Sequence, residues 1–178
     1  MRGIKRSIND IISTRIFGSM NDDACISELD RLKPDIVIVF GTGKLQLPVI
    51  EVASFACLNL HGGNPERYRG LDTHLWSIYH NDFGDLVTTL HHVDADLDTG
   101  DIVFQSKLKV EVGTRLHQLR AINTKVCVNL FFVALGAFQS IGWLPSRKQV
   151  SHGRYYSYMP AVLKEECIRK FNRYVTGL

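Results

Sequence analysis

An amide, an imidazole and a carboxylate stand beside short glycine-containing turns in the 178-residue chain. They are Asn59 and His61, in Asn59-Leu60-His61, and Asp98, in Leu97-Asp98-Thr99-Gly100. Such groups can stabilise a carbonyl oxygen that becomes charged, and can move protons to and from a reacting amine. These are the parts needed to transfer a one-carbon acyl group onto an amine.

Their spacing suggests how the three side chains could meet. Asn59 and His61 are two residues apart at the end of a predicted strand, so they project the same way. Asp98 lies in a loop after a strand that could neighbour theirs. For His61 alone, a structural role is the simpler interpretation. The expected meeting of His61 with Asn59 and Asp98, which come from separate segments, favours a catalytic role instead. We expect Asn59 and the His61 imidazolium to stabilise an oxyanion, and Asp98 to hold the imidazole in its useful tautomer.

The surrounding segments predict an α/β, Rossmann-like fold with a mostly parallel sheet flanked by helices. Ile36-Val37-Ile38-Val39-Phe40 is a continuous apolar run, typical of a parallel strand covered on both faces. Thr114 is expected to cap a long helix that turns Val133, among others, toward the core. We expect further strands over residues 54–60, 85–93 and 102–110, the last two paired, and helices over residues 24–32, 72–79, 114–139 and 161–177.

The chain is expected to form a single domain over residues 1–178, by the length prior. Its motif-bearing core spans 34–110 and its C-terminal helices span 114–178. Residues 1–23 contain no convincing strand, so we expect a sheet that is shortened on its N-terminal side. A truncated sequence would explain this, and so would a natural short form that completes its sheet with a partner.

Composition narrows the classes of protein. The longest apolar run, Val126 to Phe138, is shorter than the roughly 20 residues that a membrane span needs, and it predicts a buried helix. No apolar segment follows the basic N-terminal residues, and the four scattered cysteines fit reduced thiols. A net charge of +3 is too small to argue for nucleic acid. We expect a cytoplasmic protein with no membrane partner.

Two phosphate-binding motifs fail on inspection. Gly41-Thr42-Gly43-Lys44 suggests a P-loop, but Ile38 stands where the first glycine belongs and Leu45 where Ser or Thr belongs. Gln46 occupies the place of the third glycine of a dinucleotide fingerprint. A plain turn from strand to helix is the better interpretation.

Metal binding is also disfavoured. Asp94 to Asp98 resembles the start of a calcium loop, but Thr99 and Gln105 stand at the positions of its obligatory Gly and Glu. His91-His92 lies on a predicted strand, where adjacent side chains point to opposite faces and cannot share one ion. We expect structural or surface roles for both histidines, and no metal.

In their order and spacing these motifs resemble those of the 10-formyltetrahydrofolate-dependent formyltransferases. That family has an Asn-x-His at a strand end, a Pro-containing Arg-Tyr-Arg-Gly loop and a Leu-Asp-x-Gly loop. The matching segments here are Asn59-Leu60-His61, Pro65 to Gly70 and Leu97 to Gly100, within a resemblance that covers about residues 34–110. Gly62-Gly63 replaces a common Pro-Ser, and Pro65 sits one residue early.

The resemblance implies a folate-dependent N-formyltransferase with 10-formyltetrahydrofolate as co-substrate. It implies catalytic roles for Asn59, His61 and Asp98. The residues that it places against the folate are Lys44, Leu45, Gln46, Asp94, Ala95 and Asp96. The residues that it places in a substrate loop are Arg67, Tyr68, Arg69 and Gly70.

The acceptor is chosen by elimination. In the family that the chain resembles, transfer-RNA formyltransferases carry a C-terminal RNA-binding domain, and we expect the segment after residue 150 to be too short for one. Purine-pathway relatives bind a phosphoribosyl acceptor through an N-terminal glycine-rich turn, which we do not expect here. The resemblance therefore implies a nucleotide-linked amino sugar as the acceptor. Tyr155, Tyr156 and Tyr158 could pack on the sugar. Formylation of methionyl-tRNA or a phosphoribosyl amine, a non-catalytic folate-binding module and a metal-dependent hydrolase stay as alternatives, and a homodimer is left open.

Overall fold

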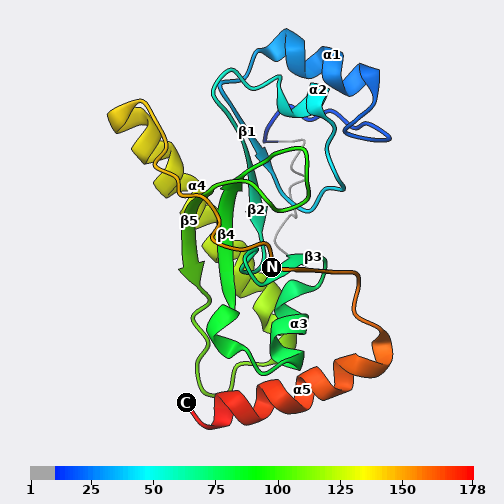
Figure 1. Ribbon diagram of the computed structural model, residues 1–178, viewed down its shortest axis with the longest axis vertical. Helices are drawn as coiled ribbons and strands as arrows, with labels where there is room; N and C mark the ends of the chain where they lie inside the picture. Colours follow the sequence, from blue (N-terminus) through cyan, green and yellow to red (C-terminus); the bar gives the residue numbers. More distant parts are fainter. Residues whose placement is uncertain (1–10) are drawn as a thin grey trace, which may run out of the picture.

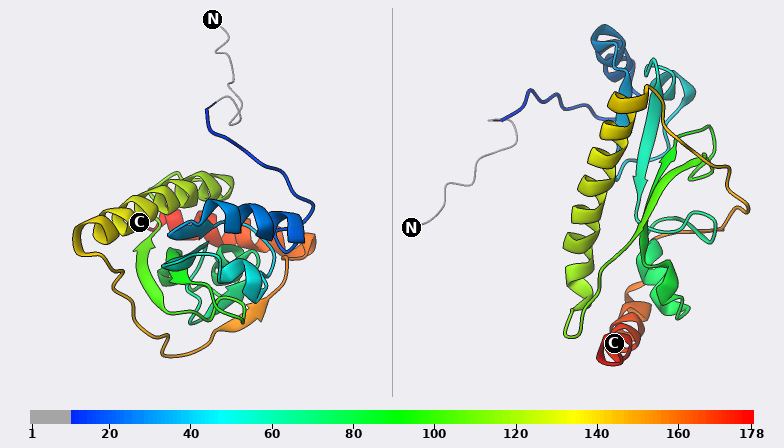
Figure 2. Two further views of the ribbon diagram at one scale, coloured as in Figure 1. Left: turned by 90° about the horizontal axis from the view of Figure 1, so that it is seen from above. Right: turned by 90° about the vertical axis from the view of Figure 1, so that its left-hand side faces the viewer.

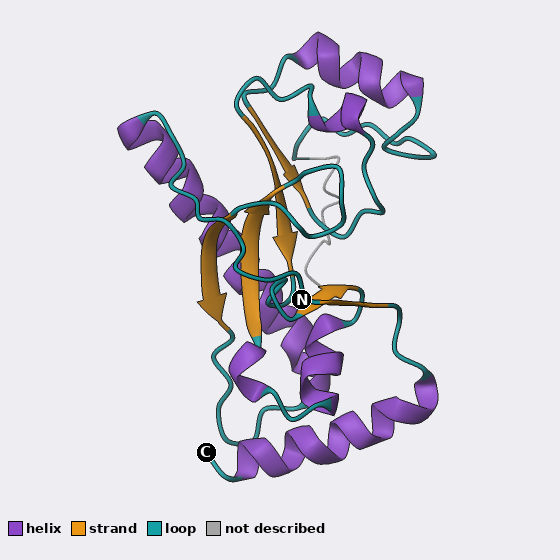
Figure 3. Cartoon of the chain, viewed as in Figure 1, coloured by secondary structure: helices purple, strands orange, loops and turns teal. Residues whose placement is uncertain are grey.

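A computed structural model describes residues 11–178 (Figures 1 and 3). Helices and strands alternate through most of this range, as expected for an α/β fold. The elements in chain order are α1 (Asp23–Leu32), β1 (Ile36–Val39), α2 (Leu47–Ile50), β2 (Ala56–His61), β3 (Tyr68–Gly70), α3 (Thr73–Tyr79), η2 (Phe83–Asp85), β4 (Val87–His92), β5 (Ile102–Lys107), η3 (Leu116–Gln118), α4 (Leu119–Ile141), β6 (Arg154–Tyr156) and α5 (Ala161–Thr176).

The main sheet has four strands in the order β1-β2-β4-β5. β1 and β2 are parallel, whereas β2 with β4 and β4 with β5 are antiparallel. The α/β architecture is therefore confirmed, and so is the pairing of the last two strands across the 94–101 loop. The expectation of a mostly parallel sheet is wrong for this sheet, which is mixed. A second sheet pairs β3 with β6 in parallel.

Helix α4 covers one face of the main sheet (Figure 2). Its inner face places Cys127, Leu130 and Ala134 against Leu58 and Leu90 of the strands. Burial of these side chains provides the main force that holds helix and sheet together. The 142–158 segment runs along the opposite side of the sheet before the chain enters α5 (Figure 2).

The outer face of α4 differs from the buried helix expected there. Val128, Phe132 and Val133 are 47%, 62% and 53% exposed, so only one face of the apolar run is buried and Val133 does not point inward. The run also belongs to a longer helical segment, Leu116–Ile141, which by length and composition alone could cross a membrane. The expectation that this part of the chain is too short to cross a membrane was therefore wrong for the whole helical segment. The inner face of α4 nevertheless packs on the main sheet.

The strand and helix ends shift by a few residues from their expected positions. Thr114 bonds the Glu111 backbone N–H in a turn, so it does not cap α4, which begins at Leu119 after a 3₁₀ turn. β5 ends at Lys107. α3 and α5 pack together at the end of the molecule away from α1, around the buried Phe171 (Figure 1).

Candidate active site

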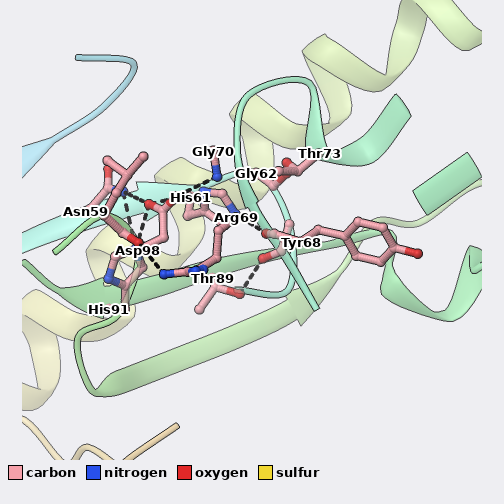
Figure 4. A network of polar contacts seen from close by, with 12 residues as sticks. Asn59, His61, Gly62, Tyr68, Arg69, Gly70, Thr73, Thr89, His91 and Asp98 are labelled. Carbon is pink, nitrogen blue, oxygen red and sulfur yellow. Dashed lines mark hydrogen bonds and ion pairs between the residues drawn. The ribbon is translucent and has the colours of Figure 1, made fainter. Parts of the chain in front are cut away.

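The C-terminal half of β2 delivers two polar side chains to a cluster that Asp98 completes (Figure 4). Asp98 Oδ1 lies 3.5 Å from His61 Nδ1 and 3.3 Å from Asn59 Nδ2. His61 and Asp98 are almost fully buried. The structure thus brings the amide, imidazole and carboxylate together, as their spacing in the sequence suggested.

A backbone carbonyl determines the His61 tautomer. His61 Nε2 lies 2.9 Å from the Tyr68 carbonyl oxygen, which can only accept, so Nε2 carries a proton. In the neutral ring Nδ1 is then the basic atom, and it faces Asp98. The structure assigns to Tyr68 the tautomer selection that was expected of Asp98.

Burial favours the neutral form of His61. Burial lowers its pKa most and His91 lowers the pKa further, against the opposite effects of Asp98 and of the Tyr68 carbonyl. A neutral Nδ1 can accept a proton from a reacting group. The imidazolium formed would then lie beside the Asp98 carboxylate, which offsets its charge.

Asp98 is held as a carboxylate. Burial alone would raise its pKa, but the His91 and His61 rings, when protonated, and the Gly70 backbone N–H lower the pKa to about 2. The Gly70 N–H donates to Asp98 Oδ2 at 2.8 Å. Asp98 itself has φ 56°, a left-handed conformation that Asp tolerates better than most residues.

The loop that carries Asp98 is fixed from three sides. The Gln149 amide donates to the carbonyl oxygens of Asp98 and Gly100, at 3.0 and 2.8 Å, and Arg69 Nη1 donates to the Leu97 carbonyl oxygen. A Cβ at Gly100 would lie 1.9 Å from the His92 carbonyl oxygen, so only glycine fits there. The position of the carboxylate is therefore set before any ligand arrives.

Gly62-Gly63, a departure from the family pattern, packs tightly behind His61. A Cβ at Gly63 would lie 2.8 Å from Thr73 Oγ1 and 3.1 Å from His61 Nε2. Thr73 Oγ1 donates to the Gly62 carbonyl and Thr89 Oγ1 donates to the Gly63 carbonyl. Glycine at position 63 thus lets the turn approach the imidazole closely.

A first cavity of about 350 Å³ opens on one side of His61. The expected folate residues Lys44, Leu45, Asp94 and Asp96 line it, together with Asn59, His61, His91 and Asp98. Gln46 and Ala95 line a neighbouring depression instead. We call the segments Lys44–Gln46 and Asp94–Asp96, which line this cavity through all their residues except Gln46 and Ala95, the turn wall. We call Asn59, His61, His91 and Asp98 the reactive cluster.

The turn at 44–46 is clamped by Asn21, which sequence analysis did not single out. Asn21 Nδ2 donates to the Lys44 carbonyl at 3.0 Å, and the Gln46 N–H donates to Asn21 Oδ1 at 2.8 Å. Gln46 precedes α2, which confirms a strand-to-helix turn here. Asn21 lies more than 20 residues before this turn, and no sequence motif links the two segments, so the contact could not be predicted from the sequence.

The Arg67–Gly70 loop reaches the cluster mainly through its backbone. Arg67 pairs with Asp82 and Asp85, and the Tyr68 hydroxyl also donates to Asp82. Among the four residues expected in a substrate loop, Gly70 lines both cavities beside His61, whereas Arg67, Tyr68 and Arg69 line neither. Their part in substrate binding stays a prediction.

A second cavity of about 490 Å³ lies on the other side of His61. It shares His61, Gly62, Gly70 and Leu71 with the first cavity. Its other polar lining residues are Asp72, Thr73, His74, His117, Arg120 and Asn123. Of the three C-terminal tyrosines, Tyr155 lines the first cavity, and Tyr156 stacks on Trp76 and Tyr68.

His91 is a member of the cluster that the sequence did not reveal. It is 2% exposed, and its Nε2 lies 3.2 Å from Asn59 Nδ2 and 3.6 Å from Asp98 Oδ1. The alternation of side chains along a strand correctly predicted that His91 and His92 point to opposite faces of the sheet, but it did not reveal which residues His91 contacts. In residues 11–178 no group of three His, Cys, Asp or Glu side chains is placed to hold a metal ion.

The cluster can therefore donate a hydrogen bond from an amide, accept a proton at an imidazole and hold a negative charge beside it. These functions suit acyl transfer to an amine, in which a carbonyl oxygen becomes charged and a proton must leave the nucleophile. The two cavities that meet at His61 could hold the two reactants.

Comparisons with known proteins agree with this chemistry. The family model "Formyl transferase" matches residues 13–131, more than half of the chain. A methionyl-tRNA formyltransferase of Halothermothrix orenii is 30% identical over 145 residues, 79% of this chain and 44% of the relative. The chain thus spans less than half the length of this curated relative.

Solved structures share the fold. The formyltransferase PseJ from Anoxybacillus kamchatkensis, in complex with a UDP-linked formamido sugar and tetrahydrofolate, has a TM-score of 0.59 at 24% identity, over 68% of this chain and 64% of that one. A likely sugar N-formyltransferase from Mycobacterium tuberculosis has a TM-score of 0.65 at 17% identity, over 88% and 72%. With the matching family model, these findings show that the chain belongs to the formyl transferase family.

Proposed function

We propose that the chain transfers a formyl group from 10-formyltetrahydrofolate to a primary amine. One observation carries the proposal: Asn59, His61 and Asp98 meet where two cavities adjoin. In this reaction the amine nitrogen bonds the formyl carbon, the bond from that carbon to N10 breaks, and a proton passes from the amine to N10.

The residues divide this work by their chemistry. An Asn59 N–H donates to the formyl oxygen as negative charge develops there. His61 Nδ1 accepts the amine proton, directly or through water, and Asp98 stabilises the imidazolium. Tyr68 keeps the opposite nitrogen of the ring protonated, so that Nδ1 stays the basic atom.

We place the folate in the first cavity. Val39, Leu45 and Leu97 give it apolar walls, and the 44–45 backbone and Asp94 supply polar groups at its edge. An apolar slot with a few polar groups suits a flat heterocycle that also hydrogen-bonds. PseJ was solved with tetrahydrofolate bound, which supports the same class of co-substrate here.

We place the acceptor in the second cavity, and propose a nucleotide-linked amino sugar. Arg120 and His117 line this cavity and could meet the phosphates of such a molecule. PseJ was solved with a UDP-linked sugar, which supports this class. The H. orenii relative favours methionyl-tRNA as the second candidate acceptor. We also propose a cytoplasmic location, in which the four buried thiols would stay reduced.

The test is to incubate the protein with 10-formyltetrahydrofolate and either UDP- or dTDP-linked amino sugars or methionyl-tRNA. We expect a formamide product by mass spectrometry from an amino sugar. Formylated methionyl-tRNA alone would reverse the order of acceptors. Folate binding without transfer to any amine would favour a non-catalytic binding module, and neither binding nor transfer would end the proposal.

Arg120→Gln tests the placement of the acceptor. We expect the KM for a nucleotide-linked acceptor to rise roughly tenfold, as after loss of a hydrogen bond to a charged group, with the KM for folate unchanged. Lys125→Gln is the matched control, because Lys125 is exposed on the same helix and does not line the cavity. Equal effects of both changes would point to general charge rather than to this cavity.

A further inference from the structure

His91 stands in direct register with Asn59. The antiparallel pairing of β2 and β4 sets Asn59 opposite His91, and side chains of such a pair lie on the same face of the sheet. His92, the next residue, points to the opposite face. The contact between Asn59 and His91 is therefore built into the register of the two strands.

The tautomer of His91 follows from its backbone contact. His91 Nδ1 lies 2.7 Å from the His92 carbonyl oxygen, so Nδ1 must donate. The neutral ring then has a lone pair on Nε2, 3.2 Å from Asn59 Nδ2. That nitrogen accepts one of the two amide protons of Asn59.

The second amide proton of Asn59 has a different partner. It faces Asp98 Oδ1 at 3.3 Å, on the side where Asn59 and Asp98 line the first cavity. A formyl oxygen that becomes charged can replace Asp98 as the acceptor of this proton. The other amide proton of Asn59 stays hydrogen-bonded to His91 Nε2 while the acceptor of the first proton changes.

We propose that His91 is a positioning residue: it accepts one Asn59 amide proton and thereby keeps the other directed at the reacting carbonyl. This role rests on the proposed formyl transfer. It also accounts for a histidine that is 2% exposed and has both ring nitrogens in polar contacts. Without His91, the carboxamide could rotate about its last bond, and its donor would no longer be fixed.

Two substitutions separate this role from simple space filling. Glutamine at position 91 can place an oxygen acceptor near the position of Nε2, whereas asparagine reaches only as far as Nδ1. His91→Asn should lower kcat roughly tenfold, the effect of one lost hydrogen bond, whereas His91→Gln should stay within about threefold of wild type. His92→Asn and His92→Gln are the matched controls on the other face of β4.

A double-mutant cycle shows whether His91 acts through Asn59. In an Asn59→Ala background, His91→Asn should cause no further loss of kcat, because the group that it positions is absent. A loss that persists undiminished in that background would overturn the proposal. Equal losses from His91→Asn and His91→Gln would overturn it as well.

A measurement on the wild-type protein keeps the inference testable if formyl transfer fails. Nitrogen-15 NMR of the imidazole reports the tautomer, and the Asn59 side-chain amide can be assigned by its loss in Asn59→Asp. We expect the proton on His91 Nδ1, and amide exchange of Asn59 that is at least tenfold faster in His91→Asn but near wild type in His91→Gln. A proton on Nε2 of neutral His91, or unchanged exchange in His91→Asn, would refute the inference whatever the activity.

Discussion

The reactive cluster of the first cavity consists of buried or partly buried side chains that contact one another, whereas the turn wall consists mostly of exposed residues, with Leu45 as its buried exception. Asp98 is 7% exposed and has polar contacts with Asn59, His61, His91 and the Gly70 backbone. In the turn wall, the side chains of Lys44 and Asp96 are 61% and 83% exposed, and their amino and carboxylate groups lie 3.9 Å apart.

This difference indicates how the two sides would work. The reactive cluster is preorganised, so it can act on charge that appears in the transition state without first rearranging. In the turn wall, the 44–46 turn is held by two hydrogen bonds of Asn21, and the side chains of Lys44 and Asp96 are exposed, so we expect this wall to contribute contacts to a flat ligand rather than reacting groups. Changes in the cluster should therefore affect the rate, and changes in the turn wall should affect affinity.

Asp98→Asn should give the largest effect. The amide cannot offset the charge of the His61 imidazolium, so kcat should fall roughly 10²- to 10⁴-fold, as for loss of an acid–base group, while folate affinity changes little. Asp96→Asn removes an exposed carboxylate of the same loop and is the matched control. If both variants lost kcat equally, the proposed division between the two sides would fail.

Asp98→Asn and Asp96→Asn should also differ in how their free energy of unfolding changes at acid pH. The Asp98 pKa is about 2 when folded, against an ordinary value of 3.8, so ionisation of this carboxyl adds about 2 kcal/mol to the stability as the pH rises from below 2 to above 4. Because the folded pKa is depressed, this stabilisation is present above about pH 4 and is lost as the pH falls toward 2.

Urea unfolding at several pH values measures this effect. The difference in free energy of unfolding between wild type and Asp98→Asn should shrink across that acid window, whereas Asp96→Asn should run parallel to wild type. A pH-independent difference for Asp98→Asn would mean that the carboxylate is not ionised in the folded cluster.

The sequence predicted the parts of the cluster whose positions depend on local geometry. Asn59 and His61 are two residues apart on one strand, and alternation alone places them on one face. The tight turn at Leu97–Gly100 marked Asp98 as part of a defined loop. The placement of Asp98 beside Asn59 and His61 also assumed that the strand before its loop neighbours theirs.

The partners missed by sequence analysis depend on pairing between distant segments. His91 joins Asn59 only because β2 and β4 are antiparallel in one particular register, and that register cannot be read from either strand alone. Tyr68 contributes a backbone carbonyl, which every residue has. The outer face of α4 was misjudged for a related reason: an apolar helix that is covered on one side and one that is buried all round have similar composition.

Asn21→Ala should have a moderate effect, and on affinity alone. It removes two hydrogen bonds that hold the 44–46 turn, each worth about 1 kcal/mol, so the dissociation constant for tetrahydrofolate should rise roughly tenfold with kcat nearly unchanged. Isothermal titration measures the binding, and Asn129→Ala on the exposed face of α4 is the matched control. A large loss of kcat would show that the turn wall also positions the reacting groups.

Lys44→Gln should give the smallest effect. Exposed ion pairs contribute at most about 1 kcal/mol and weaken with salt. Loss of the Lys44–Asp96 pair should therefore change the free energy of unfolding by less than about 1 kcal/mol, and the dissociation constant for tetrahydrofolate by less than about threefold. The backbone of residues 44 and 45 is unchanged by this substitution, and it is the part of the turn that we expect to contact the folate. If Lys44→Gln weakened binding tenfold, and if salt weakened wild-type binding to the same extent, the turn wall would act by charge. It would then resemble the reactive cluster in mechanism, and the contrast between the two sides would not hold.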